Sequence, residues 1–262
     1  MTTKETVELH HLLEGPEDAP ALVLANSLGT TLAMWDAQVP ALFKDFRLLR
    51  YDHRGHGGSP VSEPPYAIED LGRDALAMLD GLGIERFSFC GLSVGGMVGM
   101  WLASEAPERI SRLVLVCTSA LLGPKEVWDE RISVSRKDGV GALEDAVLQR
   151  WFTPEFRAAR PETVERVGRD LRETSAEGYA GCCAAIRDMD LRSRLASIQA
   201  PTLVISGSDD PSTPPEHGEF IHEGITGSRF MVVEPAAHLS NIEQPEAVNR
   251  AILEHLEPVR ER

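Results

Sequence analysis

Hydrophobic residues gather along the chain into short runs, separated by longer stretches in which they recur every three or four positions. The runs cover residues 21–25, 46–51, 87–90, 113–117, 202–206 and 229–233. Short, nearly continuous apolar runs are typical of strands that are buried on both faces of a sheet. The pattern therefore predicts strands at these positions, with room for helices between them.

Three of the intervening stretches have helical character. Residues 66–82 carry apolar side chains at intervals of three and four, and residues 94–106 are small and apolar almost throughout. Residues 245–256 are amphipathic and begin at a proline, which suits the first turn of a helix. Strands that alternate with helices predict an α/β fold, with a mostly parallel sheet and helices on both faces.

The alternation stops between residues 122 and 194, where the pattern is helical, aromatic residues are frequent and no strand-like run occurs. We interpret this segment as a helical cap that covers one end of the sheet. The sequence thus predicts a single domain over residues 1–262. Its core is formed by residues 1–121 and 195–262, and the cap insertion spans about residues 122–194.

Composition and charge narrow the range of partners. The chain has 262 residues, of which 42% are hydrophobic, as in ordinary globular proteins with a full core. It carries 26 Lys and Arg against 41 Asp and Glu, a net charge of −15. This charge repels phosphate backbones and anionic bilayers, so we expect no nucleic acid and no membrane as partner. The oligomeric state is not predictable from these data.

The start of the chain (MTTKETVELHHLLEG) lacks the apolar segment and cleavage site of a signal peptide, and no run of about 18 apolar residues follows. The cysteines form no CxxC pair, and we expect buried, reduced thiols and a cytoplasmic location. They are Cys90, Cys117, Cys182 and Cys183. His53 and His56 lack an evident third ligand, so no metal site is predicted.

A nucleophile is indicated where the strand at 87–90 meets the helix at 94–106. Residues 91–95 read Gly-Leu-Ser-Val-Gly, a G-x-S-x-G pattern centred on Ser93. A serine between a buried strand and a buried helix occupies a sharp turn, and the flanking glycines let the backbones pass. The alternative is a glycine-rich turn with a surface serine. The strand before and the helix after the motif favour Ser93 as a nucleophile.

Two further loops offer the partners that a nucleophilic serine requires. His238 follows the last predicted strand, where it can reach a nucleophile at the same sheet edge. Asp209 and Asp210 follow the strand at 202–206, and either can orient the histidine; we choose Asp210, because the turn after it should fix its direction. The order Ser93, Asp210, His238 matches one of three unrelated triad topologies.

Acyl transfer also needs donors for the oxyanion. One is expected from the backbone N–H of Val94, directly after the serine. The other is expected from Leu28, in the loop Asn26-Ser27-Leu28-Gly29-Thr30 after the first apolar run. Each such donor typically lowers the barrier by about 3 kcal/mol.

These motifs resemble the α/β-hydrolase fold superfamily over essentially the whole chain. Three segments are similar to 3-oxoadipate enol-lactonases: residues 26–31 (NSLGTT), residues 91–103 (GLSVGGMVGMWLA) and residues 178–191 (GYAGCCAAIRDMDL). The resemblance implies a Ser-His-Asp hydrolase that opens 3-oxoadipate enol-lactone to 3-oxoadipate in bacterial degradation of protocatechuate and catechol. It implies no metal and no organic cofactor.

The implied substrate is a small lactone that carries a carboxylate, so the site needs an apolar wall and a cation. We expect Trp128 in the wall and Arg187 as the cation, although Asp188 beside it also permits a structural ion pair. Further options for the cation are Arg131, Arg136 and Lys137. Met97 and Trp101, on the helix after the nucleophile, are expected in the core.

Other functions remain open at this level. A general carboxylesterase or a cofactor-free perhydrolase would use the same triad. A receptor that keeps the triad but only senses a small molecule represents a different class. Haloalkane dehalogenases and many epoxide hydrolases carry aspartate at the nucleophile position, and Ser93 argues against them.

Overall fold

The computed structural model describes residues 5–256, which fold around a seven-stranded sheet with the strand order β1-β3-β2-β4-β5-β6-β7. β1 pairs antiparallel with β3, and every other neighbouring pair is parallel. The strands are β1 (His11–Glu14), β2 (Ala21–Ala25), β3 (Arg47–Tyr51), β4 (Phe87–Leu92), β5 (Ile110–Val116), β6 (Thr202–Gly207) and β7 (Arg229–Val233). The mostly parallel sheet predicted from the apolar runs is confirmed.

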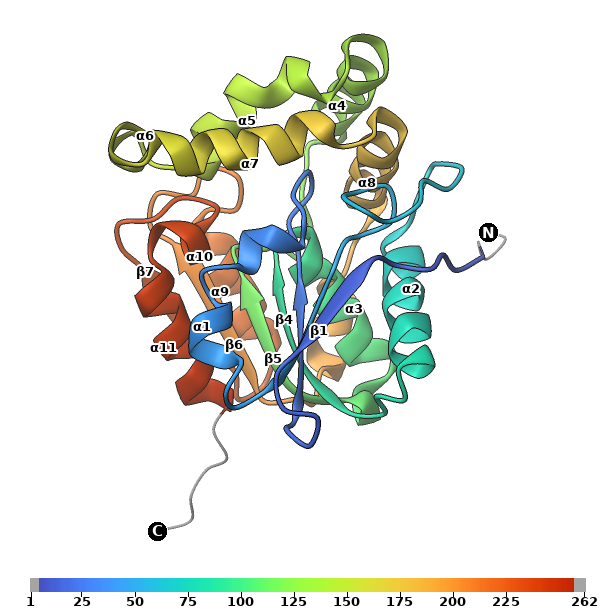
Figure 1. The fold of residues 1–262 in the computed structure, drawn as a ribbon, viewed down its shortest axis with the longest axis vertical. Helices are drawn as coiled ribbons and strands as arrows, with labels where there is room; N and C mark the ends of the chain where they lie inside the picture. Colours follow the sequence, from blue (N-terminus) through green and yellow to red (C-terminus); the bar gives the residue numbers. More distant parts are fainter. Residues whose placement is uncertain (1–4, 257–262) are drawn as a thin grey trace.

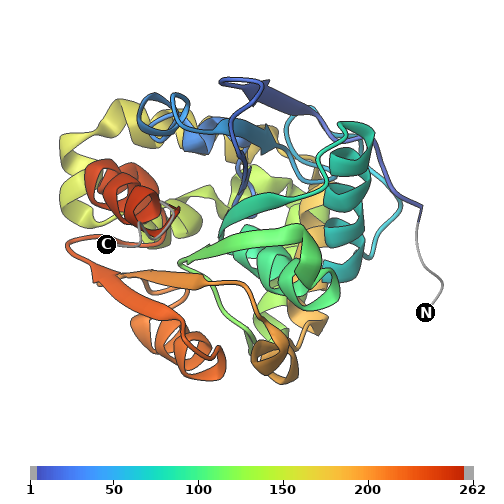
Figure 2. The ribbon, with the colours of Figure 1, turned by 90° about the horizontal axis from the view of Figure 1, so that it is seen from below.

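Helices cover both faces of the sheet (Figures 1 and 2). One face carries α1 (Val39–Leu42) and α11 (Pro245–Leu256); the other carries α2 (Ile68–Gly81), α3 (Val94–Glu105) and α9 (Pro215–Gly224). β2, β4 and β6 are almost fully buried between these layers, which explains why their sequences are apolar without alternation. Within residues 5–256, no helix combines the length and the apolar character needed to cross a bilayer.

The segment between β5 and β6 is helical, as predicted, and Figure 1 shows it lying across the carboxyl ends of the strands. Its helices are α4 (Lys125–Asp138), α5 (Glu144–Trp151), α6 (Pro154–Ala159), α7 (Pro161–Glu173) and α8 (Ala176–Asp188). α4 and α8 pack extensively against each other. The arrangement is consistent with a cap, whose limits at residues 122 and 194 stay a prediction.

Hydrogen bonds hold the cap on the core close to the sheet edge. Glu243, at the end of the short helix α10 (Ser240–Glu243), accepts hydrogen bonds from the N–H (2.7 Å) and the hydroxyl (2.9 Å) of Thr153. The other oxygen of Glu243 accepts from the Ala237 N–H. Leu239 N–H donates to the Trp151 carbonyl at 3.0 Å. The loop after β7 and the end of α5 are therefore fixed relative to each other.

Several residues expected in the interior are found there. Met97 and Trp101 are buried on α3, as predicted. All four cysteines are free and buried. Burial raises the pKa of each thiol, to about 12 for Cys183 and further for the others. Such thiols are protonated at neutral pH and behave as small apolar side chains.

Candidate active site

Ser93 occupies the sharp turn between β4 and α3, with φ 57° and ψ −116°. Two neighbouring segments hold this unusual conformation: Ser93 N–H donates to the Val116 carbonyl at 3.0 Å, and the Thr118 hydroxyl donates to the Ser93 carbonyl at 2.7 Å. Gly95 lies so close to β2 that a Cβ there would overlap the Ala25 carbonyl. The strands on both sides of β4 thus fix the strained turn that presents Ser93.

Asp210 and His238 meet because they follow neighbouring parallel strands. β6 and β7 end in register, with Gly207 opposite Val233, and the two loops continue side by side. The His238 Nδ1 lies 2.8 Å from Asp210 Oδ2, and both side chains are buried. The side chain of Asp209 is instead exposed and bonded to the Ser208 hydroxyl. The geometry therefore pairs the histidine with Asp210, the residue that the sequence analysis chose.

The carboxylate of Asp210 is surrounded by donors. Its Oδ1 accepts the N–H groups of Ser212 (2.8 Å) and Thr213 (3.1 Å), and its Oδ2 accepts the Thr213 hydroxyl at 2.6 Å. Burial alone would raise the pKa of Asp210, but the charge of His238 and these hydrogen bonds hold the pKa below its ordinary value. An ionised carboxylate only accepts hydrogen bonds, so the imidazole proton lies on Nδ1 and Nε2 is left as a base.

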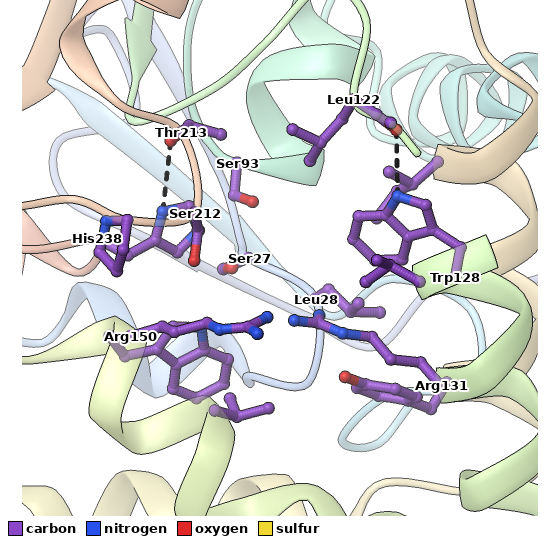
Figure 3. Close-up of a pocket in the computed structure, with 17 residues that line it drawn as sticks. Ser27, Leu28, Ser93, Leu122, Trp128, Arg131, Arg150, Ser212, Thr213 and His238 are labelled. Carbon is purple, nitrogen blue, oxygen red and sulfur yellow. Dashed lines mark hydrogen bonds between the residues drawn. The ribbon is translucent and has the colours of Figure 1, made fainter. Parts of the chain in front are cut away.

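Ser93 and His238 line one cavity of about 400 Å³ beneath the cap (Figure 3). No hydrogen bond joins the two side chains in the part of the chain described here, and such bonds are often long before substrate binds. The loop after β2 lines the same cavity with Ser27 and Leu28. Within residues 5–256, the N–H groups of Leu28 and Val94 have no acceptor in the protein. Both are free to bind an oxyanion.

The cap supplies an apolar wall opposite these groups. Trp128 lies in this wall, where the sequence analysis expected it, and its indole N–H donates to the Leu122 carbonyl at 3.0 Å. Because that hydrogen bond satisfies the polar atom, the ring faces the cavity as an apolar surface. The other apolar lining residues from the cap are Leu122, Val127, Val147, Trp151, Tyr179 and Ile186.

Two arginines from the cap also line the cavity, Arg131 on α4 and Arg150 on α5. Figure 3 shows their guanidinium groups pointing toward one another. Neither forms an ion pair with a carboxylate in residues 5–256, and Arg131 lies over the ring of Trp128 at 4.9 Å from its centroid. Partial burial and then the charge of Arg131 lower the pKa of Arg150. Two facing cations without a counter-ion favour binding of an anion.

The structure corrects the prediction for Arg187. Its guanidinium does not line the cavity, because it pairs with Asp129 and Asp188, each at 2.6 Å. Its neighbour Ile186 faces the cavity, and consecutive residues of a helix point in different directions. The structural ion pair is therefore the correct interpretation.

The other residues considered for the substrate-binding cation lie either at the cavity or away from it. Arg136 pairs with Glu177 at 3.0 Å, and neither Arg136 nor Lys137 lines the cavity. Arg131 does line it, so one of the alternatives offered by the sequence is at the site. Arg150 was missed, since a single arginine on an amphipathic helix carries no distinguishing pattern.

His53 and His56 have a structural environment. His53 Nε2 bonds to the Asn26 carbonyl at 3.1 Å, and burial, followed by the nearby His56, lowers the pKa of His53 to about 3. Burial also lowers the pKa of His56, so both rings are neutral near pH 7. Among residues 5–256, no three His, Cys, Asp or Glu side chains are grouped to hold a metal ion.

Comparison with known proteins identifies relatives that match this chain over nearly its full length. 3-Oxoadipate enol-lactonase 2 of Acinetobacter baylyi is 43% identical over 251 residues, covering 95% of this chain and 93% of the relative. The crystal structure of the enol-lactonase from Burkholderia xenovorans LB400 superimposes with a TM-score of 0.94 at 43% identity, covering 95% and 96% of the two chains. A hydrolase from Pseudomonas aeruginosa PA01 gives 0.93 at 48%, covering 96% and 95%.

The model of the alpha/beta hydrolase fold family matches residues 20–245. This match runs from β2, which leads into the loop of Ser27 and Leu28, to the first residue of α11, beyond the loop that holds His238. The serine turn, the acid loop and the histidine loop all fall inside it, in the order that this fold requires. The chain therefore belongs to the α/β-hydrolase fold family.

Proposed function

We propose that this chain hydrolyses 3-oxoadipate enol-lactone to 3-oxoadipate, a reaction of bacterial aromatic degradation. One observation carries the proposal: a single cavity holds Ser93 and His238 on its core side and, on its cap side, two arginines that have no carboxylate partner among residues 5–256. Such a cavity suits an ester that carries a carboxylate at a distance from its carbonyl. The full-length similarity to proteins named enol-lactonases supports this choice of substrate.

The reaction begins with attack of Ser93 on the lactone carbonyl, which forms a tetrahedral intermediate. The serine oxygen attacks the lactone carbonyl while His238 Nε2 takes the hydroxyl proton, and the charged Asp210 stabilises the imidazolium that forms. The negative charge that develops on the carbonyl oxygen is bound by the N–H groups of Leu28 and Val94. Each of these donors is expected to lower the barrier by about 3 kcal/mol.

Collapse of this intermediate opens the ring and leaves Ser93 acylated, and hydrolysis of the acyl-enzyme then releases the acid. The tetrahedral intermediate collapses with cleavage of the ring C–O bond, and the leaving oxygen is an enol that becomes a ketone. An enol is more acidic than an alkyl alcohol, so its departure needs less proton donation from His238. Water then attacks the acyl-enzyme with His238 as base. These steps need no metal or organic cofactor.

Binding of the substrate would use the cap. The carboxylate fits between Arg131 and Arg150, and the ring fits against the apolar wall that includes Trp128. Arginine is suited to this role because its planar group binds carboxylates with two parallel hydrogen bonds. The two cations also provide a local attraction in a protein whose net charge of −15 otherwise repels anions.

The test compares kcat/KM for the enol-lactone with the values for a neutral five-membered lactone and for p-nitrophenyl acetate. Since the arginines bind only the charged substrate, we expect the enol-lactone to exceed the neutral lactone by about 100-fold or more. Equal values for the charged and neutral lactones would favour a general carboxylesterase. Folded protein without turnover of any of the three would favour a receptor.

A further inference from the structure

Two donors share one oxygen of the triad acid. Asp210 Oδ2 accepts from His238 Nδ1 at 2.8 Å and from the Thr213 hydroxyl at 2.6 Å. Thr213 lies in the loop between β6 and α9 and is 1% exposed, so water does not compete for this bond. The other oxygen, Oδ1, is already held by the N–H groups of Ser212 and Thr213. The backbone thus orients the carboxylate without help from the hydroxyl.

We propose that Thr213 is a positioning residue whose hydroxyl sets the proton affinity of His238 by drawing charge from the oxygen that faces it. A hydrogen bond to an ionised carboxylate spreads its negative charge, and less charge is left to stabilise a neighbouring imidazolium. His238 then stays unprotonated, and able to act as a base, at lower pH than it would beside Asp210 alone. The inference rests on the proposed triad.

A second contact of the same hydroxyl acts on the histidine directly. Thr213 Oγ1 lies 3.4 Å from His238 Nδ1, the contact drawn as a dashed line in Figure 3. Because the hydroxyl proton points at Asp210, the oxygen lone pairs face the Nδ1–H and favour that tautomer. Alone, this contact would raise the proton affinity of His238. The bond to Asp210 is 0.8 Å shorter (3.4 − 2.6) and involves an ion, so its opposite effect dominates.

Other ionisable groups face the pair from every side. Cys117, after β5, interacts with Asp210, and burial, followed by the charge of Asp210, raises the pKa of this thiol, so it stays neutral. Glu243 on α10 binds the Ala237 N–H beside His238, and Asp209 precedes the acid. Arg131 and Arg150 approach from the cap. A substitution at Thr213 leaves all of these groups in place, so it isolates the contribution of the hydroxyl.

The experiment replaces the hydroxyl and follows His238 itself. Thr213→Val and Thr213→Ala remove it, and Thr213→Ser keeps it; NMR titration of the His238 imidazole in the substrate-free protein is the primary readout. Loss of the hydroxyl should raise the His238 pKa by up to about 0.7 units in Val and Ala, because only the difference in its hydrogen bond between neutral and protonated His238 counts. The serine variant should stay within about 0.2 units of wild type.

The pH profile of kcat/KM for p-nitrophenyl acetate is the second readout. Its acid limb should move upward by the same amount in Thr213→Val and keep its wild-type position in Thr213→Ser. The control is Thr202→Val, which removes a buried hydroxyl on β6 that donates to the Ala200 carbonyl. This variant should change stability without moving the acid limb of the pH profile.

An unchanged or lowered His238 pKa in both Thr213→Val and Thr213→Ala would overturn the inference. A reduced plateau with an unmoved acid limb would also overturn it, because that pattern indicates packing alone. The NMR readout needs no substrate. An enol-lactone that is not turned over would therefore contradict the proposed function and leave this inference intact.

Discussion

The two sides of the cavity differ in how their charged groups are satisfied before any substrate binds. On the core side, Asp210 is buried and accepts four hydrogen bonds, one of them from His238. On the cap side, Arg131 and Arg150 point at one another without a carboxylate partner in the part of the chain that the structure describes. The groups proposed to react are thus arranged in advance, whereas the groups proposed to bind the substrate are left open for its charge.

A core arginine makes the same contrast sharper. Arg54 is 1% exposed and donates to both oxygens of Asp74, at 2.5 and 2.6 Å. Asp74 also accepts the Val7 N–H at 2.9 Å, so this ion pair is complete and has no capacity for a ligand. Residue type therefore does not separate a structural arginine such as Arg54 from the cap arginines that we propose to bind substrate. The presence or absence of a facing carboxylate does.

The largest effect is expected on the core side, from Ser93→Ala. Without the nucleophile, kcat/KM for the enol-lactone should fall by about 10⁴-fold or more, as in other triad hydrolases. Thermal unfolding should change little, because the side chain makes no hydrogen bond that holds the turn. Steady-state kinetics and a melting curve check both points. Activity within tenfold of wild type would exclude Ser93 as nucleophile.

Asp209 and Asp210 offer a matched pair of substitutions, for which we expect the second-largest effect. Asp210→Asn keeps the shape of the site but places an amide against His238 Nδ1, and kcat should fall by about 10⁴-fold through the wrong tautomer. Asp209→Asn, on an exposed side chain bonded only to Ser208, should stay within about threefold of wild type. An inactive Asp209 variant beside an active Asp210 variant would reverse the assignment.

The core side was predictable from sequence because it depends on local pattern and on topology. Apolar runs revealed β4, β6 and β7, and parallel strands place their following loops at one edge. Ser93, Asp210 and His238 each follow one of these runs directly, so their meeting required no knowledge of side-chain packing.

The cap side was not predictable in the same way. Arg131, Arg136 and Arg187 all lie on cap helices, and only the packing of those helices decides which guanidinium meets a carboxylate. Arg187 stands in one of the three segments that resemble enol-lactonases, yet its partner Asp129 is 58 residues away in sequence and is brought close only by the fold. The bond between Thr213 and Asp210 was hidden for the same reason.

Substitutions of the cap arginines should affect binding rather than chemistry. Arg131→Gln and Arg150→Gln should each raise KM for the enol-lactone by about tenfold to 100-fold, with kcat within about threefold, since each loses a charge-assisted bond worth ~1.5–3 kcal/mol. Arg136→Gln, on the same helix as Arg131, and Arg187→Gln serve as controls. Their KM values should stay within about twofold of wild type. Equal KM values in all four variants would show that backbone donors or water bind the carboxylate.

A smaller effect, on stability, is expected at Glu243, which joins the cap to the loop that holds His238. Glu243→Gln keeps the size of the side chain, but its NH₂ group meets either the Thr153 or the Ala237 N–H and leaves a buried donor unsatisfied. The free energy of unfolding should fall by about 1–3 kcal/mol in urea titrations. Glu254→Gln, at an exposed position of α11, should stay within about 0.5 kcal/mol. Equal stability of both variants would mean that Glu243 does not hold the cap and the histidine loop together.

The smallest effect separates the cap arginines from the charge of the whole molecule. The net charge of −15 repels an anionic lactone over long distances, whereas Arg131 and Arg150 attract it at close range. Salt screens the long-range part first, because the Debye length falls to about 10 Å at 0.1 M. Raising the salt concentration from about 10 to 150 mM should therefore increase kcat/KM for the enol-lactone by up to about twofold and leave neutral p-nitrophenyl acetate unchanged. A decrease for the lactone would mean that the arginines govern its approach as well as its binding, and the same titration with Arg150→Gln would then restore the increase.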